Sequence, residues 1–276
     1  MIMNTNKVNS LLRLFLVLLP FLFGALLGKH SPYQAMNPIT TYILIWSVFT
    51  FVFSLVVLKY ASNKMAFPLL LMASPIVGIF GMLAPPDLSL AMLDHPEREH
   101  LRYFFLFMGA FLFSVFYFLH IKLNVVKTDR LSKYIMTSIF LMVLIELVWE
   151  FTHHYLYPEA LAGWIAEGKK LEDFNKNYDN VSVINGVVLG RVLQFSLISW
   201  LSIQLYQSGL SKLWSPVLTL FLSLVGIISA GVIYFTEMNL PKGFEFLFLF
   251  FIPGMPFIIL YWMGVALAAN PTLPKQ

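Results

Sequence analysis

Long apolar segments separated by short polar intervals dominate this chain. The first segment runs from Leu14 to Leu27, and further segments cover residues 39–58, 65–84, 103–123, 134–157, 183–206, 213–235 and 244–269. Because about 20 helical residues at a rise of about 1.5 Å span the hydrocarbon of a bilayer, each segment is close to the length needed to cross it. The pattern predicts an all-α integral membrane protein, a bundle of about eight transmembrane helices.

The polar intervals are short, and the longest of them, from Pro158 to Ser182, is only about 25 residues. We therefore predict a single polytopic membrane domain over residues 1–276, without a separate soluble domain. Within this interval Leu161, Trp164 and Ile165 recur at the spacing of three and four that is typical of an interfacial helix. Residues 158–182 are predicted to form an outer loop with a short interfacial helix, or alternatively a lid over a site beneath it.

Basic residues in the connections predict the orientation of the chain. More Lys and Arg fall on the side of the N-terminus than on the other, and Asp129 is the only acid expected on that side. This bias predicts an N-in/C-in topology. We expect a multi-pass protein of the cell membrane, and specifically of a bacterial inner membrane.

Composition agrees with a membrane protein and excludes several chemistries. Hydrophobic residues make up 59% of the chain, charged residues 12%, and the mean hydropathy is +0.77. The net charge of +4 is divided between two sides of a membrane, so no nucleic acid partner is expected. The absence of cysteine excludes disulfides, thiolate metal ligands and a cysteine nucleophile. Expected partners are the lipid bilayer and a lipid or apolar small molecule, with a homo-oligomer or a membrane complex left open.

Ionisable residues gather near the end of the apolar segment 134–157. On a helix, Glu146, Glu150, His153 and Tyr157 fall within a stripe about 60° wide. A charged side chain near the bilayer centre costs about 2.5 to 3.5 kcal/mol on insertion scales, so it needs a partner or a task. This stripe is the candidate site.

Arg191 is predicted to be the partner of this stripe. It lies about as deep in the following antiparallel helix as Glu150 does in its own, about 10 Å from the outer end. Two carboxyl groups against one guanidinium leave one acid that needs a proton, another cation or water. The candidate catalytic residues are therefore Glu146, Glu150, His153 and Arg191, for acid/base chemistry or proton transfer. The alternative is an Arg–Glu pair that only fixes helix packing.

The spacing Glu-x-x-His suggests a metal alternative. It occurs as Glu150 with His153 and as Glu97 with His100, and such pairs are the ligands of helical di-metal carboxylate sites. We retain Glu150, His153, Glu97 and His100 as candidate ligands of a divalent metal. A site made by His153 and His154 alone is less favoured, since adjacent helical residues diverge by about 100°.

Three functional classes remain open. The favoured one is a membrane-embedded enzyme that acts on a lipid or apolar substrate by acid/base or metal-assisted chemistry. The alternatives are a proton-coupled transporter of small molecules or ions and a non-catalytic subunit of a membrane complex. The chain has 15 glycines against 27 phenylalanines, and bundles whose helices slide usually need more small residues. The Pro-Gly-x-Pro run that begins at Pro253 is predicted either to kink the last segment or to unwind it.

Overall fold

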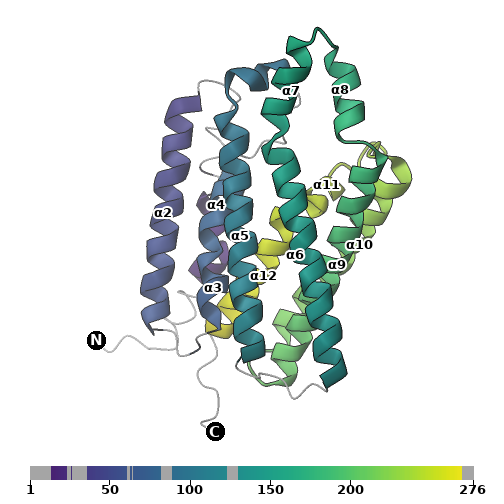
Figure 1. Ribbon diagram of the computed structural model, residues 1–276. Coiled ribbons are helices and arrows are strands. Elements are labelled where there is room, and N and C mark those ends of the chain that lie inside the picture. Colours follow the sequence, from purple (N-terminus) through teal and green to yellow (C-terminus); the bar gives the residue numbers. More distant parts are fainter. Residues whose placement is uncertain are drawn as a thin grey trace.

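Helices account for nearly all of the chain that the computed structural model describes, namely residues 14–23, 26, 36–60, 63, 65–81, 89–122 and 130–268 (Figure 1). No strand occurs within these ranges, so the all-α class is confirmed for them. Five helical spans are long and apolar enough to cross a membrane: Thr40–Lys59, Glu97–Lys122, Arg130–Ala166, Val181–Gln207 and Trp214–Thr236. Shorter apolar helices cover Leu14–Phe23, Ala66–Gly81 and Gly254–Ala268. The architecture is therefore membrane-like. The count of about eight spans and the N-in/C-in topology stay predictions. Asp129, which was used to predict the orientation, lies outside the described residues.

The elements follow one another along the chain as helices joined by short connections. In order they are α2 (Met36–Tyr60), α3 (Ala66–Leu71), α4 (Ala73–Gly81), the 3₁₀ helix η1 (Leu90–Asp94), α5 (Glu97–Lys122), α6 (Arg130–Tyr155), α7 (Tyr157–Ala166), α8 (Leu171–Tyr178), α9 (Val181–Gln207), α10 (Trp214–Thr236), α11 (Leu247–Phe251) and α12 (Gly254–Ala268). Consecutive long helices α5, α6, α9 and α10 pack as neighbours. Within the predicted segment 65–84, a turn at Met72 separates the two short helices α3 and α4.

Apolar side chains cover the outside of the long helices. On α6, Ile145 is 69% exposed and Leu131 67% exposed, and Phe111 on α5 is 66% exposed. In water such a surface would be unfavourable, because each exposed apolar side chain forgoes about 1.5–3 kcal/mol of burial. Lipid tails remove this cost, so the exposed apolar belt fits a bilayer.

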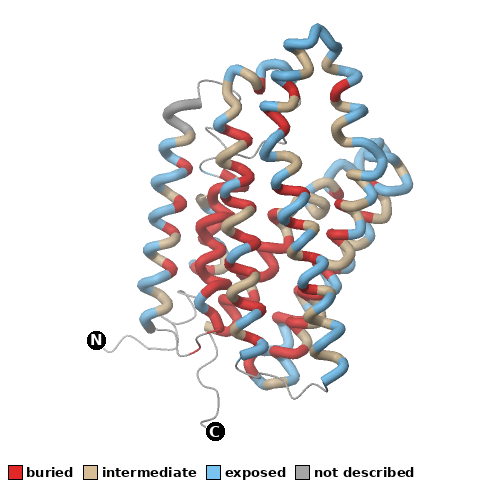
Figure 2. Tube along the Cα trace, in the orientation of Figure 1, coloured by how far each residue is buried: buried red, intermediate tan, exposed pale blue. Residues whose placement is uncertain are grey.

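The buried core is built around α12, which contacts α3, α4, α5, α9, α10 and α11 (Figure 2). Gly264 allows α3 to approach α12 closely, since a Cβ placed on it would lie 2.6 Å from Leu69 Cβ and 3.0 Å from the Leu69 backbone. The helix α2 packs against α3 and α4 at one side of the bundle. The central position of α12 therefore depends on small residues where backbones meet.

The predicted interruption of the last apolar segment is present between α11 and α12. Ile252 ends α11 in an extended conformation, and Pro253 has no N–H to continue the helix. The backbone N–H of Met255 donates to the carbonyl of Ile252 at 3.1 Å. A regular helix would instead direct that N–H to the carbonyl of Phe251, which is thus left for another donor.

The interval 158–182 contains two helices, α7 and α8, which lie at one end of the bundle (Figure 1). We call this end the α7–α8 end. A buried apolar cluster joins the two helices to η1; its members are Met92, Tyr157, Leu161 and Phe174. The apolar span Arg130–Ala166 has 37 residues, more than the roughly 20 needed to cross hydrocarbon, and it includes α7 after a turn at Leu156. The interfacial position of a helix in this interval stays a prediction.

Candidate functional site

An ion pair between α6 and α9 is the centre of the candidate site. Arg191 Nη2 donates to Glu150 Oε1 at 2.5 Å and to Oε2 at 2.7 Å. The Arg191 side chain is 0% exposed and that of Glu150 is 6% exposed. The predicted contact between these two residues is therefore confirmed.

Arg191 has a second acceptor, which comes from the break between α11 and α12. Its Nε donates to the carbonyl of Phe251 at 2.7 Å. This is the carbonyl that the extended residue Ile252 and Pro253 leave without its helical donor. The break therefore satisfies a buried guanidinium N–H, and the guanidinium satisfies a buried carbonyl.

Glu146 lies one turn before Glu150 on α6 and is held differently. Its Oε2 accepts a hydrogen bond from Gln194 Nε2 at 2.9 Å, and its Oε1 lies 3.9 Å from Arg191 Nη1. Within the described residues, Glu146 Oε1 and Arg191 Nη1 are both buried without a hydrogen-bond partner. This group thus consists of one guanidinium, one carboxylate with both oxygens hydrogen-bonded, and one carboxyl group with an oxygen that has no hydrogen-bond partner among the described residues.

Gly190 provides the space that Glu146 occupies. A Cβ on Gly190 would lie 2.0 Å from Glu146 Cδ, a distance at which either the carboxyl group or the helix must move. Gly186, four residues earlier on α9, lies against Trp149, since a Cβ placed on it would be 3.1 Å from the Trp149 ring. The two glycines therefore permit close packing of α6 and α9, and Gly190 also accommodates a polar group of the site.

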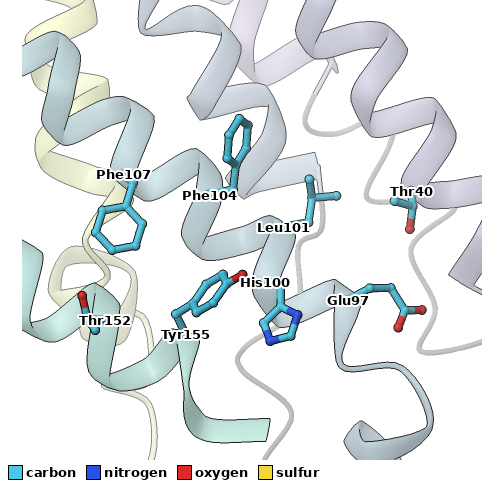
Figure 3. Close-up of a pocket in the computed structure, with 8 residues that line it drawn as sticks. All are labelled: Thr40, Glu97, His100, Leu101, Phe104, Phe107, Thr152 and Tyr155. Atoms are coloured by element: carbon cyan, nitrogen blue, oxygen red, sulfur yellow. The ribbon is translucent and has the colours of Figure 1, made fainter. Parts of the chain in front are cut away.

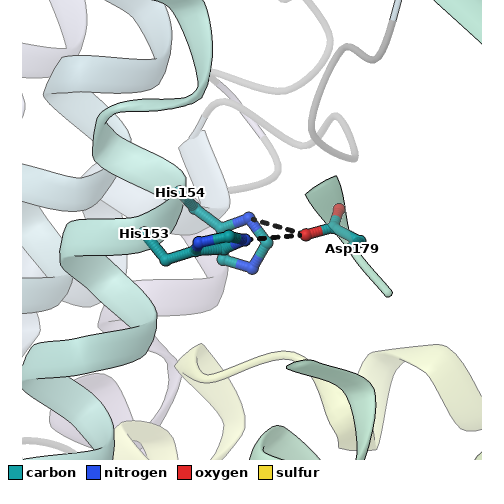
Figure 4. Close-up of side chains that lie close together, drawn as sticks. All are labelled: His153, His154 and Asp179. Carbon is teal, nitrogen blue, oxygen red and sulfur yellow. Dashed lines mark hydrogen bonds and ion pairs between the residues drawn. The ribbon is translucent and has the colours of Figure 1, made fainter. Parts of the chain in front are cut away.

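A second polar group lies nearer the α7–α8 end and joins α6 to the start of α9 (Figure 4). His153 Nε2 lies 3.1 Å from Asp179 Oδ1, and His154 Nδ1 lies 4.0 Å from the same oxygen. These three residues form the His153–His154–Asp179 cluster. Their ligand atoms lie within 4.8 Å of one another.

Aromatic rings position the two imidazoles of the cluster. The ring of Tyr178 stacks on His153 at 4.2 Å, and the ring of Tyr103 stacks on His154 at 5.7 Å. The hydroxyl of Tyr178 also donates to the carbonyl of His153 at 2.6 Å. Burial raises the pKa of Tyr178 to about 12, with the Asp179 and Glu159 carboxylates adding to the effect, so the hydroxyl stays a neutral donor.

The four ligands predicted from the Glu-x-x-His spacing do not meet at one point. Glu150 pairs with Arg191, and His153 pairs with Asp179. His100 Nε2 lies 2.9 Å from Glu159 Oε1, and Glu97 lies beside His95. Among the described residues, the His153–His154–Asp179 cluster is the group of three with ligand atoms close enough for one metal ion.

A groove of about 570 Å³ opens between α2, α5 and α6 near the α7–α8 end (Figure 3). Its lining is largely apolar and consists of Thr40, Glu97, His100, Leu101, Phe104, Phe107, Thr152 and Tyr155. On α6, Thr152 lies about 160° around the helix from Glu150. The groove therefore belongs to a different face of α6 from the ion pair, and Glu146, Glu150 and His153 do not line it.

Sequence reasoning missed the residues that complete both groups. Asp179 lies in a predicted loop, Gln194 carries no charge, and the Phe251 carbonyl is a backbone group. One signal was available for Asp179: it precedes Asn180, whose side chain accepts from the backbone N–H of Ser182 at 2.9 Å as the N-cap of α9. An acid just before the N-cap of a helix lies close to the end of the preceding antiparallel helix.

A comparison with protein-family models, curated proteins and solved structures finds no match to this chain. Likeness to a known protein therefore assigns no residue a role. The roles proposed below depend on the contacts of the two polar groups alone.

Proposed function

We propose that this chain is a membrane-embedded enzyme that acts on a lipid or other apolar substrate by acid–base chemistry. The observation that supports this most strongly is the unequal pairing of the two glutamates. Glu150 is fully engaged by Arg191, whereas Glu146 keeps a buried oxygen without a partner. Two carboxyl groups in different environments are the arrangement that a general acid or base requires.

In this proposal the three residues have separate tasks. Arg191 holds Glu150 through two hydrogen bonds, and Glu146 takes up and releases the proton. The unpartnered Nη1 of Arg191 lies 3.9 Å from Glu146 Oε1, so one substrate oxygen could lie within hydrogen-bonding distance of both. The guanidinium would then stabilise negative charge on that oxygen while Glu146 exchanges its proton.

The surroundings of Glu146 favour an apolar substrate. The Glu146 side chain is 12% exposed although its unpartnered Oε1 is buried, so in this proposal a substrate reaches that oxygen when neighbouring side chains move aside. The residues next in sequence to Glu146 and Gly190 are apolar and exposed to the outside of the bundle, Ile145 at 69% and Leu189 at 59%. A molecule that reaches Glu146 from this side must cross an apolar surface, as a lipid does.

A survey of lipid turnover tests the proposal. Purified protein is reconstituted into vesicles made from total bacterial membrane lipid, and the lipids are followed by mass spectrometry over hours. The wild-type chain is expected to deplete at least one lipid species, and Glu146→Gln is expected to reduce that rate at least 100-fold. Glu172→Gln, which changes an exposed acid on α8, is the matched control and should leave the rate unchanged.

Equal lipid profiles for the wild-type chain and Glu146→Gln, with both proteins folded, would refute the enzyme. A proton-coupled carrier is the second candidate, because interrupted helices whose free carbonyls face a charged group are typical of carriers. Vesicles that contain a pH-sensitive dye distinguish the two: a carrier gives substrate-dependent proton uptake that Glu146→Gln abolishes, without any change in lipid composition.

A further inference from the structure

We propose that the His153–His154–Asp179 cluster binds one divalent transition-metal ion, with zinc as the best match. The cluster shares no residue with the Glu146–Glu150–Arg191 group. The metal site therefore goes beyond the acid–base proposal, and its test does not depend on the outcome of that proposal. Imidazole nitrogens and a carboxylate oxygen are the donors that zinc prefers when thiolates are absent.

The distances in the cluster are close to those of a metal site. Zinc holds nitrogen and oxygen ligands at about 2.0–2.2 Å, so tetrahedral ligand atoms lie about 3.3 Å apart. Here His153 Nε2 lies 3.1 Å and His154 Nδ1 lies 4.0 Å from Asp179 Oδ1. All three ligand atoms lie within 4.8 Å of one another, so side-chain shifts that keep the stacked rings in place are enough to bring them onto one ion.

Adjacent histidines on a helix meet here because they use different ring nitrogens. His153 reaches Asp179 with the distal Nε2, whereas His154 faces it with the proximal Nδ1 (Figure 4). The two rings stand at 74° to each other, with centroids 5.1 Å apart. The divergence of about 100° between neighbouring side chains is thus compensated by the difference in reach.

The imidazoles are held in place before any ion arrives. Tyr178 stacks on His153 and Tyr103 stacks on His154, so neither ring is free to turn away. Asp179 ends α8 and directly precedes the N-cap of α9. Rigid support of this kind lowers the entropic cost of binding an ion.

Partial exposure leaves room for further ligands. The side chains of His153, His154 and Asp179 are 19%, 22% and 27% exposed. Three protein ligands with one open position are typical of catalytic rather than structural zinc sites. The rival explanation is a His153–Asp179 ion pair that only fastens α8 and α9 to α6.

Metal titration of the purified chain distinguishes the two explanations. The protein is prepared with a histidine-free affinity tag, treated with EDTA, and titrated in detergent with zinc chloride by calorimetry and with cobalt chloride by absorption spectroscopy. We expect one zinc ion per chain with a Kd in the micromolar range or below. Cobalt should give visible absorption bands of a four- or five-coordinate ion with nitrogen and oxygen ligands.

Variants locate the ion. His153→Gln, His154→Gln and Asp179→Asn are each expected to weaken zinc binding at least tenfold and to remove the cobalt bands. His95→Gln is the matched control, because His95 is an exposed histidine paired with Glu97 outside the cluster. Asp179→Asn keeps an oxygen that accepts a hydrogen bond from His153, so it tests charge and ligation with little change in packing.

Two results would overturn the proposal. One is a wild-type chain that binds neither zinc nor cobalt at millimolar concentration. The other is zinc binding of unchanged affinity in Asp179→Asn and in a His153→Gln/His154→Gln double variant, which would place the ion elsewhere. Should Asp179→Asn fail to fold, as judged by circular dichroism, the histidine variants and the wild-type titration still show whether the cluster binds the ion.

Discussion

Replacing Arg191 with methionine removes the buried guanidinium of the site while keeping much of its volume. In the native chain Arg191 donates two short hydrogen bonds to Glu150 and one to Phe251, and it is 0% exposed. Charges about 4 Å apart attract by about 4 kcal/mol at an effective dielectric constant of about 20. Removing one member of a buried pair costs about 3–5 kcal/mol, because the other is left uncompensated. We expect Arg191→Met to lower the free energy of unfolding by that amount.

Glu150→Gln is expected to cost less, about 1–3 kcal/mol. The glutamine carbonyl still accepts one hydrogen bond from Arg191, and Glu146, with Oε1 3.9 Å from Nη1, remains as a counter-ion. When both changes are made together, neither the cation nor the anion of this pair is left without its partner. The double variant should therefore lose less than the sum of the single losses, by about 1–3 kcal/mol.

Equilibrium unfolding in mixed micelles, followed by circular dichroism, measures the three losses. Arg130→Met is the control, since Arg130 is exposed and contacts only Tyr134 in the part of the chain that is described; its cost should stay below about 0.5 kcal/mol. Losses that add to within about 0.5 kcal/mol would show that Arg191 and Glu150 do not stabilise each other. A greater loss for Glu150→Gln than for Arg191→Met would refute the supporting role given to Glu146.

Three further predictions concern the packing of α6 against α9, the stability of the α7–α8 end and the topology of the chain. Gly190→Ala should destabilise the chain by about 1–3 kcal/mol in thermal unfolding, since the added methyl group meets a carboxyl group at 2.0 Å; a neutral result would mean that α6 and α9 move apart easily. Tyr178→Phe loses the hydrogen bond to His153 and should cost about 0.5–1.5 kcal/mol, with faster hydrogen exchange confined to α8. Because the chain has no cysteine, single cysteines at Asp94 and Lys212 can be labelled cleanly, and they should react from opposite sides of the membrane.

The long helices were predictable from the local pattern of apolar residues. The central ion pair was predictable from the matched depth of Glu150 and Arg191 in consecutive helices. Continuous apolar segments of about 20 residues have few alternatives to a helix in lipid. The contact between Glu150 and Arg191 follows from two consecutive antiparallel helices and the cost of a lone buried charge. Neither inference requires knowledge of distant contacts.

The remainder of the site depends on tertiary packing, which the sequence pattern does not reveal. Asp179 reaches His153 only because α8 folds back along α7, and the apolar contacts that hold it there involve Phe174 and Tyr157. His153 and His154 approach the same Asp179 oxygen because one uses Nε2 and the other Nδ1, a difference in reach that the helical angle between adjacent residues does not reveal. The carbonyl of Phe251 lies 60 residues beyond Arg191, and nothing in its side chain marks it as an acceptor.

The central place of α12 has a consequence for how the bundle is made. This helix is synthesised after α3, α4, α5, α9 and α10, yet it is the element around which they pack. At 15 residues it is only about 22 Å long, which is shorter than the roughly 30 Å of hydrocarbon in a bilayer. The earlier helices therefore cannot complete their packing before α12 is made, because the surfaces that they bury against it have no partner until then.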